Sequence, residues 1–209
     1  MKKINKIGVI DCDIGNIYSL ENALVKLGGD YKISKNPKEF EKFDKIILLG
    51  VGSFPAVMDK LNQFGFVSLL NTHFKQGKYF LGICVGMQVL MTYGNEQIKT
   101  KGLNFIKGSV EQLIYSKDHP IPHIGWNEVL HEKNKKIEIF DEIKNRSSFY
   151  FVHSYHAKVE EKNVDTLMTE YGKNVFVSAI RKKNFYGVQF HPEKSQTSGM
   201  KVLENFIKL

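Results

Sequence analysis

Residues 79–88 read YFLGICVGMQ, an apolar run that breaks at a cysteine placed between two glycines. The apolar residues 79–83 predict a buried strand, and the residues from Gly86 onward predict the start of a helix. Cys84 then lies on the sharp turn between them. The spacing Gly-x-Cys-x-Gly has the form of a nucleophile elbow, in which small flanking residues relieve crowding around a strained turn that presents the nucleophile.

Cys84 on its own allows two interpretations. Cysteine is among the most buried residue types, so a cysteine in an apolar run is commonly an inert part of the core. A reactive cysteine also fits the pattern, because the free N–H groups and the macrodipole at a helix N-terminus favour a thiolate. The choice between the two depends on a base elsewhere in the chain.

A second apolar segment, far downstream, supplies a base and a carboxylate. Residues 185–193 read FYGVQFHPE, which predicts a strand over 185–190 that ends in His-Pro-Glu. In an extended chain His191 and Glu193 are two positions apart and project to the same side. If both strands end at the same edge of a sheet, Glu193 can orient the imidazole that receives the proton of the Cys84 thiol.

These two motifs together resemble the class I glutamine amidotransferase family. The resemblance covers essentially the whole chain, and further matches make it similar to the glutaminase subunits of imidazole glycerol phosphate synthases. It implies one glutamine amidotransferase type 1 domain over residues 1–209, with an α/β fold whose mixed, mostly parallel sheet is flanked by helices. It also implies that Cys84, His191 and Glu193 form the catalytic triad.

A strand pattern runs into a glycine-containing loop, GVGSFP at residues 50–55. From these residues alone, an ordinary strand-to-helix turn and a ligand-binding loop fit equally. The resemblance implies an oxyanion loop, in which the backbone of Val51 and Gly52 acts together with the amide of Val85. The chain departs from the family at Leu49, where proline is usual, and at Val85, where leucine is usual. Backbone contacts survive such changes, but proline fixes φ and leucine does not, so the resting conformation of the loop stays open.

The resemblance also implies which residues contact the substrate, L-glutamine. In the alternative interpretation, Gln88 is an exposed helical residue. The residues around Glu96 are by themselves weak evidence for a contact with the α-amino group of the substrate. The implied contacts are the side chains of Gln88 and Glu96 and the backbone of Ser154 and Tyr155.

Two further histidines compete with His191 for the role of base. His153 and His156 lie in an aromatic-rich segment that predicts a strand. We prefer His191 because only this histidine has a carboxylate two residues later.

Four residues are implied to face a partner protein, a (β/α)8-barrel synthase subunit: Asn16, Trp126, Tyr150 and Lys194. A lone tryptophan more often supplies core area. However, the run PHIGWN at residues 122–127, which we predict to be a loop, is similar to the pattern of this subunit in particular.

The implied activity is hydrolysis of L-glutamine to glutamate and ammonia without a cofactor. The ammonia would pass to the barrel subunit, which makes imidazole glycerol phosphate and an aminoimidazole carboxamide ribotide in histidine biosynthesis. Three alternatives stay open: a paralogous glutaminase that serves a surface-sugar amidotransferase, a catalytically silent scaffold subunit, and a cysteine peptidase of similar fold. The intact triad argues against the scaffold.

Composition excludes several other classes of protein. Hydrophobic residues make up 42% and charged residues 25%, which is ordinary for a globular domain. The net charge of +8 comes from lysines spread along the chain, without a basic run interleaved with aromatics, so we expect no nucleic-acid partner. Two cysteines, Cys12 and Cys84, form no disulfide framework, and no apolar run reaches the ~20 residues of a membrane span. We expect a cytoplasmic protein without a metal site.

Overall fold

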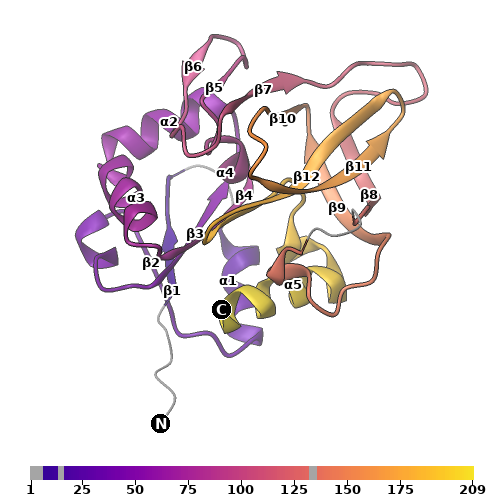
Figure 1. Ribbon diagram of the computed structural model, residues 1–209. Helices are drawn as coiled ribbons and strands as arrows, with labels where there is room; N and C mark the ends of the chain where they lie inside the picture. Colours follow the sequence, from indigo (N-terminus) through magenta and orange to yellow (C-terminus); the bar gives the residue numbers. More distant parts are fainter. Residues whose placement is uncertain (1–6, 14–16, 132–135) are drawn as a thin grey trace.

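The computed structural model describes residues 7–13, 17–131 and 136–209, and a seven-stranded sheet lies at its centre (Figure 1). Its strands are Ile7–Ile10 (β1), Tyr31–Ser34 (β2), Lys45–Gly50 (β3), Tyr79–Cys84 (β4), Asp165–Tyr171 (β11), Asn174–Lys182 (β12) and Phe185–Val188 (β13). Their order is β11-β12-β13-β4-β3-β1-β2. Pairing is parallel from β13 to β2 and antiparallel at β12 and β11. The predicted mixed, mostly parallel sheet is confirmed.

Helices cover both faces of this sheet, which explains why its central strands are continuous apolar runs. The helices are Tyr18–Lys26 (α1), Phe54–Gln63 (α2), Phe66–Lys75 (α3), Val85–Gln88 (α4) and Gln196–Lys208 (α5). Short 3-10 helices span Pro37–Phe40 (η1), Glu138–Phe140 (η2) and Pro192–Lys194 (η3). Figure 1 shows α2 and α3 on one side of the sheet and α1 and α5 on the other.

Two smaller sheets flank the central one on the side of β12. One contains Tyr93–Gly94 (β5), Thr100–Lys101 (β6), Gly108–Gln112 (β7) and Tyr155–Val159 (β10), in the order β10-β7-β5-β6. The other pairs His123–Val129 (β8) with Ser147–His153 (β9) in antiparallel register. The prediction of a loop around Trp126 is wrong. This segment is a strand because each of its residues has a partner on β9.

The turn after β4 is a nucleophile elbow, as predicted. Cys84 has φ +56° and ψ −116°, a conformation that non-glycine residues rarely adopt. A Cβ atom added to Gly82 would lie 2.2 Å from the carbonyl oxygen of Gly86, and one added to Gly86 would lie 2.2 Å from that of Leu48. At Gly50 it would lie 2.3 Å from the Gly86 nitrogen. The backbones of β3, β4 and α4 are therefore in direct contact, and only glycine fits between them.

Two predicted boundaries near the site are wrong. The strand predicted over 185–190 ends at Val188, and Glu193 lies in a 3-10 helix instead of an extended chain. Pro192 explains the change, because its fixed φ suits the first position of a helical turn. The helix predicted from Gly86 begins one residue earlier and has only four residues, so its macrodipole at Cys84 is weaker than we predicted.

The contact between β4 and α4 predicts a large effect of Gly82→Ala. We expect this substitution to lower the free energy of unfolding by about 1–3 kcal/mol, because the new methyl group would overlap a backbone oxygen. Urea unfolding measures the loss. Gly29→Ala is the control, since its Cβ would meet nothing closer than 3.4 Å. Equal losses in the two variants would contradict this account of the elbow.

Candidate active site

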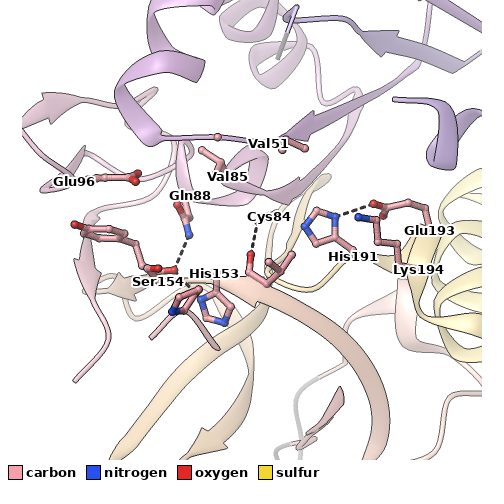
Figure 2. Close-up of a pocket in the computed structure, with 14 residues that line it drawn as sticks. Val51, Cys84, Val85, Gln88, Glu96, His153, Ser154, His191, Glu193 and Lys194 are labelled. Atoms are coloured by element: carbon pink, nitrogen blue, oxygen red, sulfur yellow. Dashed lines mark hydrogen bonds and ion pairs between the residues drawn. The ribbon is translucent and has the colours of Figure 1, made fainter. Parts of the chain in front are cut away.

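A cavity of about 420 Å³ opens beyond the C-terminal ends of β3 and β4 (Figure 2). It brings together residues that are far apart in the sequence, in the place where open α/β sheets bind ligands. Eleven residues singled out from the sequence line it: Val51, Gly52, Cys84, Val85, Gln88, Glu96, Ser154, Tyr155, His191, Glu193 and Lys194. Its volume is ample for a free amino acid.

Cys84, His191 and Glu193 follow one another in space, as Figure 2 shows. Nδ1 of His191 lies 2.7 Å from Oε1 of Glu193, and both side chains are almost fully buried. The carboxylate therefore reaches the imidazole although the chain between them is a helical turn. Burial alone lowers the pKa of His191, but its interactions with Cys84 and Glu193 outweigh burial and raise this pKa to about 10. The imidazole is thus positively charged at neutral pH and faces the sulfur, which favours a thiolate.

The backbone of β9 holds His191 in place. The N–H of His191 donates to the carbonyl oxygen of Tyr150 at 2.9 Å. The hydroxyl of Ser195 donates to the His191 carbonyl oxygen at 2.6 Å and accepts from the Tyr150 N–H at 2.9 Å. These three bonds attach the segment after β13 to the neighbouring hairpin, so the position of the base does not depend on the loop alone.

The predicted oxyanion loop follows β3 directly. Gly52 has φ +97°, which glycine adopts without strain, and Val85 is the first residue of α4. Oε2 of Glu96 accepts a hydrogen bond of 2.7 Å from the N–H of Phe54, the first residue of α2. A carboxylate at this position satisfies a free N–H group of the helix N-terminus. Glu96 therefore holds the start of α2, just after the loop, in addition to lining the cavity.

Gln88 is only 2% exposed, so the alternative interpretation of an exposed helical residue is wrong. Its Nε2 atom donates to the carbonyl oxygen of Tyr155 at 2.8 Å and to Oε1 of Gln189 at 3.0 Å. Both amide hydrogens are used in these bonds. Its Oε1 makes no hydrogen bond among the described residues and can accept one from a ligand.

His153 also lines the cavity, but its surroundings differ from those of His191. Its Nδ1 lies 2.9 Å from the Tyr155 carbonyl oxygen, and its Nε2 lies 3.1 Å from Nδ1 of His123. Burial lowers the pKa of His153 to about 3 and that of His123 to about 4. Both imidazoles are neutral near pH 7, whereas His191 is charged and has a carboxylate partner, so His191 stays the predicted base.

Trp126 and Tyr150 face each other across the β8–β9 pair, with ring centroids 6.1 Å apart. Trp126 is 48% exposed, so the interpretation as a core residue is wrong. Lys194 lines the cavity itself. Asn16 lies outside the described residues. No group of three or more metal-ligating side chains occurs among the residues that the structure describes.

Comparison with known proteins agrees with this geometry. The profile of the family "Glutamine amidotransferase class-I" matches residues 8–209. The chain belongs to this family. It is thus a glutamine amidotransferase, as the elbow and the His-Pro-Glu motif predicted.

Relatives of this amidotransferase match along almost their entire length. The imidazole glycerol phosphate synthase subunit HisH 2 of Methanococcus maripaludis is 44% identical over 97% of this chain and 98% of the relative. The HisH subunit of Pyrococcus furiosus is 42% identical over 99% of this chain and 100% of the relative.

Solved structures confirm the fold. A putative GMP synthase protein from Thermoplasma acidophilum has a TM-score of 0.73 at 21% identity, and the match covers 100% of this chain and 94% of the other. PurLQS from Thermotoga maritima has a TM-score of 0.71 at 18% identity, with 99% of both chains covered. In the described part of the amidotransferase, no helix combines the length and apolar character that a membrane span needs.

Sequence reasoning missed Gln189, His123 and the cavity position of His153. Gln189 carried a usable signal, since it lies two positions before His191 and the alternation of an extended chain places both on one side. No signal in the sequence indicates that His123 lies beside His153, because this contact depends on the register between β8 and β9.

The neutral histidine pair predicts that the amidotransferase loses stability in acid. The unfolded chain protonates histidine near pH 6.5, whereas the lowered pKa values of His123 and His153 keep the folded chain unprotonated. The free energy of unfolding therefore does not vary with pH through these two histidines above about pH 6.5. Between about pH 6.5 and pH 4 it falls as the pH is lowered, with a slope of up to about 1.4 kcal/mol per pH unit for each histidine. We expect His123→Phe to reduce this slope in urea unfolding between pH 7 and pH 4.

Tyr171→Phe is the matched control for this measurement. It keeps the ring that stacks on His123 at 4.0 Å and leaves both histidines in place. Its slope should equal that of the parent chain. An unchanged slope in His123→Phe would show that the pair does not remain neutral in the folded chain.

Proposed function

We propose that this amidotransferase is the glutaminase subunit of an imidazole glycerol phosphate synthase, acting in histidine biosynthesis as one domain over residues 1–209. The observation that carries the proposal is the identity of 40–44% to HisH subunits over nearly complete chains, in a protein whose cavity contains a buried Cys-His-Glu arrangement. The ammonia that it releases would serve a partner subunit.

The proposed reaction begins when the Cys84 sulfur attacks the side-chain carboxamide carbon of L-glutamine. The N–H groups of Val51 and Val85 stabilise the oxyanion of the tetrahedral intermediate, with Gly52 giving the loop its shape. His191, charged and held by Glu193, donates its proton as ammonia leaves. The neutral imidazole then takes a proton from water, which hydrolyses the thioester and releases glutamate.

Substrate recognition is assigned to residues on the opposite wall of the cavity. A carboxylate only accepts hydrogen bonds, and the carbonyl oxygens of Ser154 and Tyr155 are already bonded to Leu113 N–H and Gln88 respectively. Their N–H groups are therefore the atoms proposed for the α-carboxylate. Glu96 is proposed for the α-ammonium group, and Oε1 of Gln88 for the amide of the side chain.

A second protein is proposed because free ammonia would be protonated and lost in water. The described residues form no (β/α)8 barrel, so such a synthase domain would act in trans. Trp126, Tyr150 and Lys194 are the proposed contacts, since Lys194 lines the cavity and the exposed ring of Trp126 faces the half-buried ring of Tyr150 on the adjacent strand pair. Asn16 is proposed from sequence alone. The reducing cytoplasm would keep Cys84 a free thiol, and we place the reaction there.

A related glutaminase that supplies a surface-sugar amidotransferase remains the second candidate. Leu49 and Val85, which depart from the family pattern, are both buried beside the elbow. Complementation of a histidine auxotroph that lacks its own glutaminase subunit separates the two candidates. Growth on ammonia-poor medium supports the histidine pathway, and failure despite a folded protein supports the surface-sugar role.

Cys84→Ala tests the chemistry directly. We expect glutamate release from L-glutamine, measured in the presence of the barrel protein together with its acceptor, to fall by about 10³-fold or more, because the covalent route is removed. Cys12→Ala is the matched control and should keep the activity, since Cys12 is a core residue that does not line the cavity. Absence of glutaminase activity in the parent chain with every barrel partner tried would favour the scaffold alternative, and cleavage of peptides would favour a peptidase.

Trp126→Ala tests the proposed partner face. Exposed tryptophans often carry a large share of binding energy, so we expect the Kd for the barrel protein, measured by titration calorimetry, to rise about 30-fold. Trp126→Phe keeps an aromatic ring opposite Tyr150 and should lose much less. If the alanine variant and the parent chain bind the barrel protein with equal affinity, the β8–β9 pair is not part of the interface.

A further inference from the structure

Two contacts to the Cys84 sulfur lie outside the triad. Sγ lies 4.0 Å from the carbonyl oxygen of Val152, which only a thiol can reach as donor, and the second contact comes from Gln189. Nε2 of Gln189 lies 3.6 Å from Sγ of Cys84, a distance at which an N–H group donates a hydrogen bond to sulfur. Gln189 is fully buried, one residue beyond the end of β13 and two before His191. A buried carboxamide usually satisfies its polar atoms with other polar groups, so its direction toward a cysteine needs a cause.

The direction of this carboxamide follows from the groups behind it. The Tyr155 carbonyl oxygen can only accept, so the nitrogen end of the Gln88 amide must face it, at 2.8 Å. The second hydrogen of this nitrogen then donates to Oε1 of Gln189 at 3.0 Å. With its oxygen held in this way, Gln189 presents its nitrogen to the sulfur.

The same carbonyl oxygen is held from a second side. Nδ1 of His153 lies 2.9 Å from it and must carry the hydrogen, so Nε2 of His153 is an acceptor. That acceptor receives a bond from Nδ1 of His123 at 3.1 Å. Both acceptor positions of the Tyr155 oxygen are therefore used, and the chain of bonds to Gln189 runs in one direction only.

We propose that Gln189 is a catalytic residue of the glutaminase reaction, whose carboxamide N–H donates a hydrogen bond to the Cys84 sulfur and stabilises it as a thiolate. Gln88, the Tyr155 carbonyl, His153 and His123 are positioning groups that set the direction of this donor. The inference rests on the role of Cys84 as nucleophile in the proposed function.

The bond from Gln189 to the sulfur differs from that of His191 because it does not depend on a proton that the reaction moves. When ammonia leaves, it takes the proton of His191, so the imidazole is neutral in the thioester intermediate. An amide N–H does not depend on protonation and stays at the sulfur. When water attacks the thioester, the carbon–sulfur bond breaks, its electron pair goes to the sulfur, and the bond from Gln189 strengthens as negative charge develops. No proton is transferred from Gln189.

Alkylation of Cys84 by iodoacetamide tests the proposal without substrate or partner. Its rate, followed by peptide mass spectrometry across pH 5–10, reports the thiolate fraction. The readout at the Cys84 peptide avoids Cys12, whose pKa burial and the charges of Asp11 and Asp13 raise to about 12. The variants are Gln189→Met, which removes the donor, and the isosteric Gln189→Glu. Gln76→Met, at an exposed helix end, is the matched control.

We expect Gln189→Met to react about 10- to 100-fold more slowly than the parent chain at pH 7, because a hydrogen bond to a charged group is lost. At pH 10 the two rates should agree within about threefold, since the sulfur is then a thiolate in both. Gln189→Glu should move the midpoint of the profile further toward high pH, because it adds a negative charge beside the sulfur. Gln76→Met should follow the parent profile.

An unchanged profile in both Gln189 variants would overturn the proposal. A rate lowered by the same factor at every pH would also overturn it, because it would indicate a structural role. If Gln189→Met fails to fold by circular dichroism, the isosteric glutamate variant decides. A parent chain that reacts only near the pH of an ordinary thiol would instead overturn the assignment of Cys84 as nucleophile, and with it the proposed function.

Discussion

The site depends on the direct backbone contact between two strands and one turn of helix. Gly82, Gly86 and Gly50 meet there at distances that leave no space for a Cβ atom. This contact holds Cys84 at φ +56° and places its sulfur at the edge of the sheet. Because Gly50 precedes the predicted oxyanion loop, the same contact also sets the distance between that loop and Cys84. A single packing constraint thus brings two parts of the chemistry together.

The cavity holds its histidines in two opposite states. His191 is buried, but its contacts with Cys84 and Glu193 raise its pKa and keep it charged. His153 is equally buried, and a carbonyl oxygen and a second imidazole surround it, so burial keeps it neutral. The difference lies in the partners and not in the degree of burial. One wall of the cavity therefore carries a charged imidazole, and the other carries neutral imidazoles in fixed hydrogen bonds.

Expectations from sequence succeeded where neighbouring residues determine the structure. The elbow could be predicted because a cysteine between two glycines, after an apolar strand, has few other conformations. The contact of His191 with Glu193 was predicted from an extended chain, yet it forms in a helical turn. Two positions suffice for the contact in either conformation. The loop predicted around Trp126 is a strand, since its pairing partner lies more than twenty residues downstream on β9.

The sequence by itself determined the sharp turn at Cys84, the contact of His191 with Glu193, and the parallel strands that precede them, because these depend on spacing and on apolar runs. Only the tertiary structure decided that Gln88 is buried, that His123 meets His153, and that Gln189 turns its nitrogen toward Cys84. These contacts depend on strand register and on one carbonyl oxygen that can only accept hydrogen bonds. Neither property is encoded in the spacing of residues along the chain.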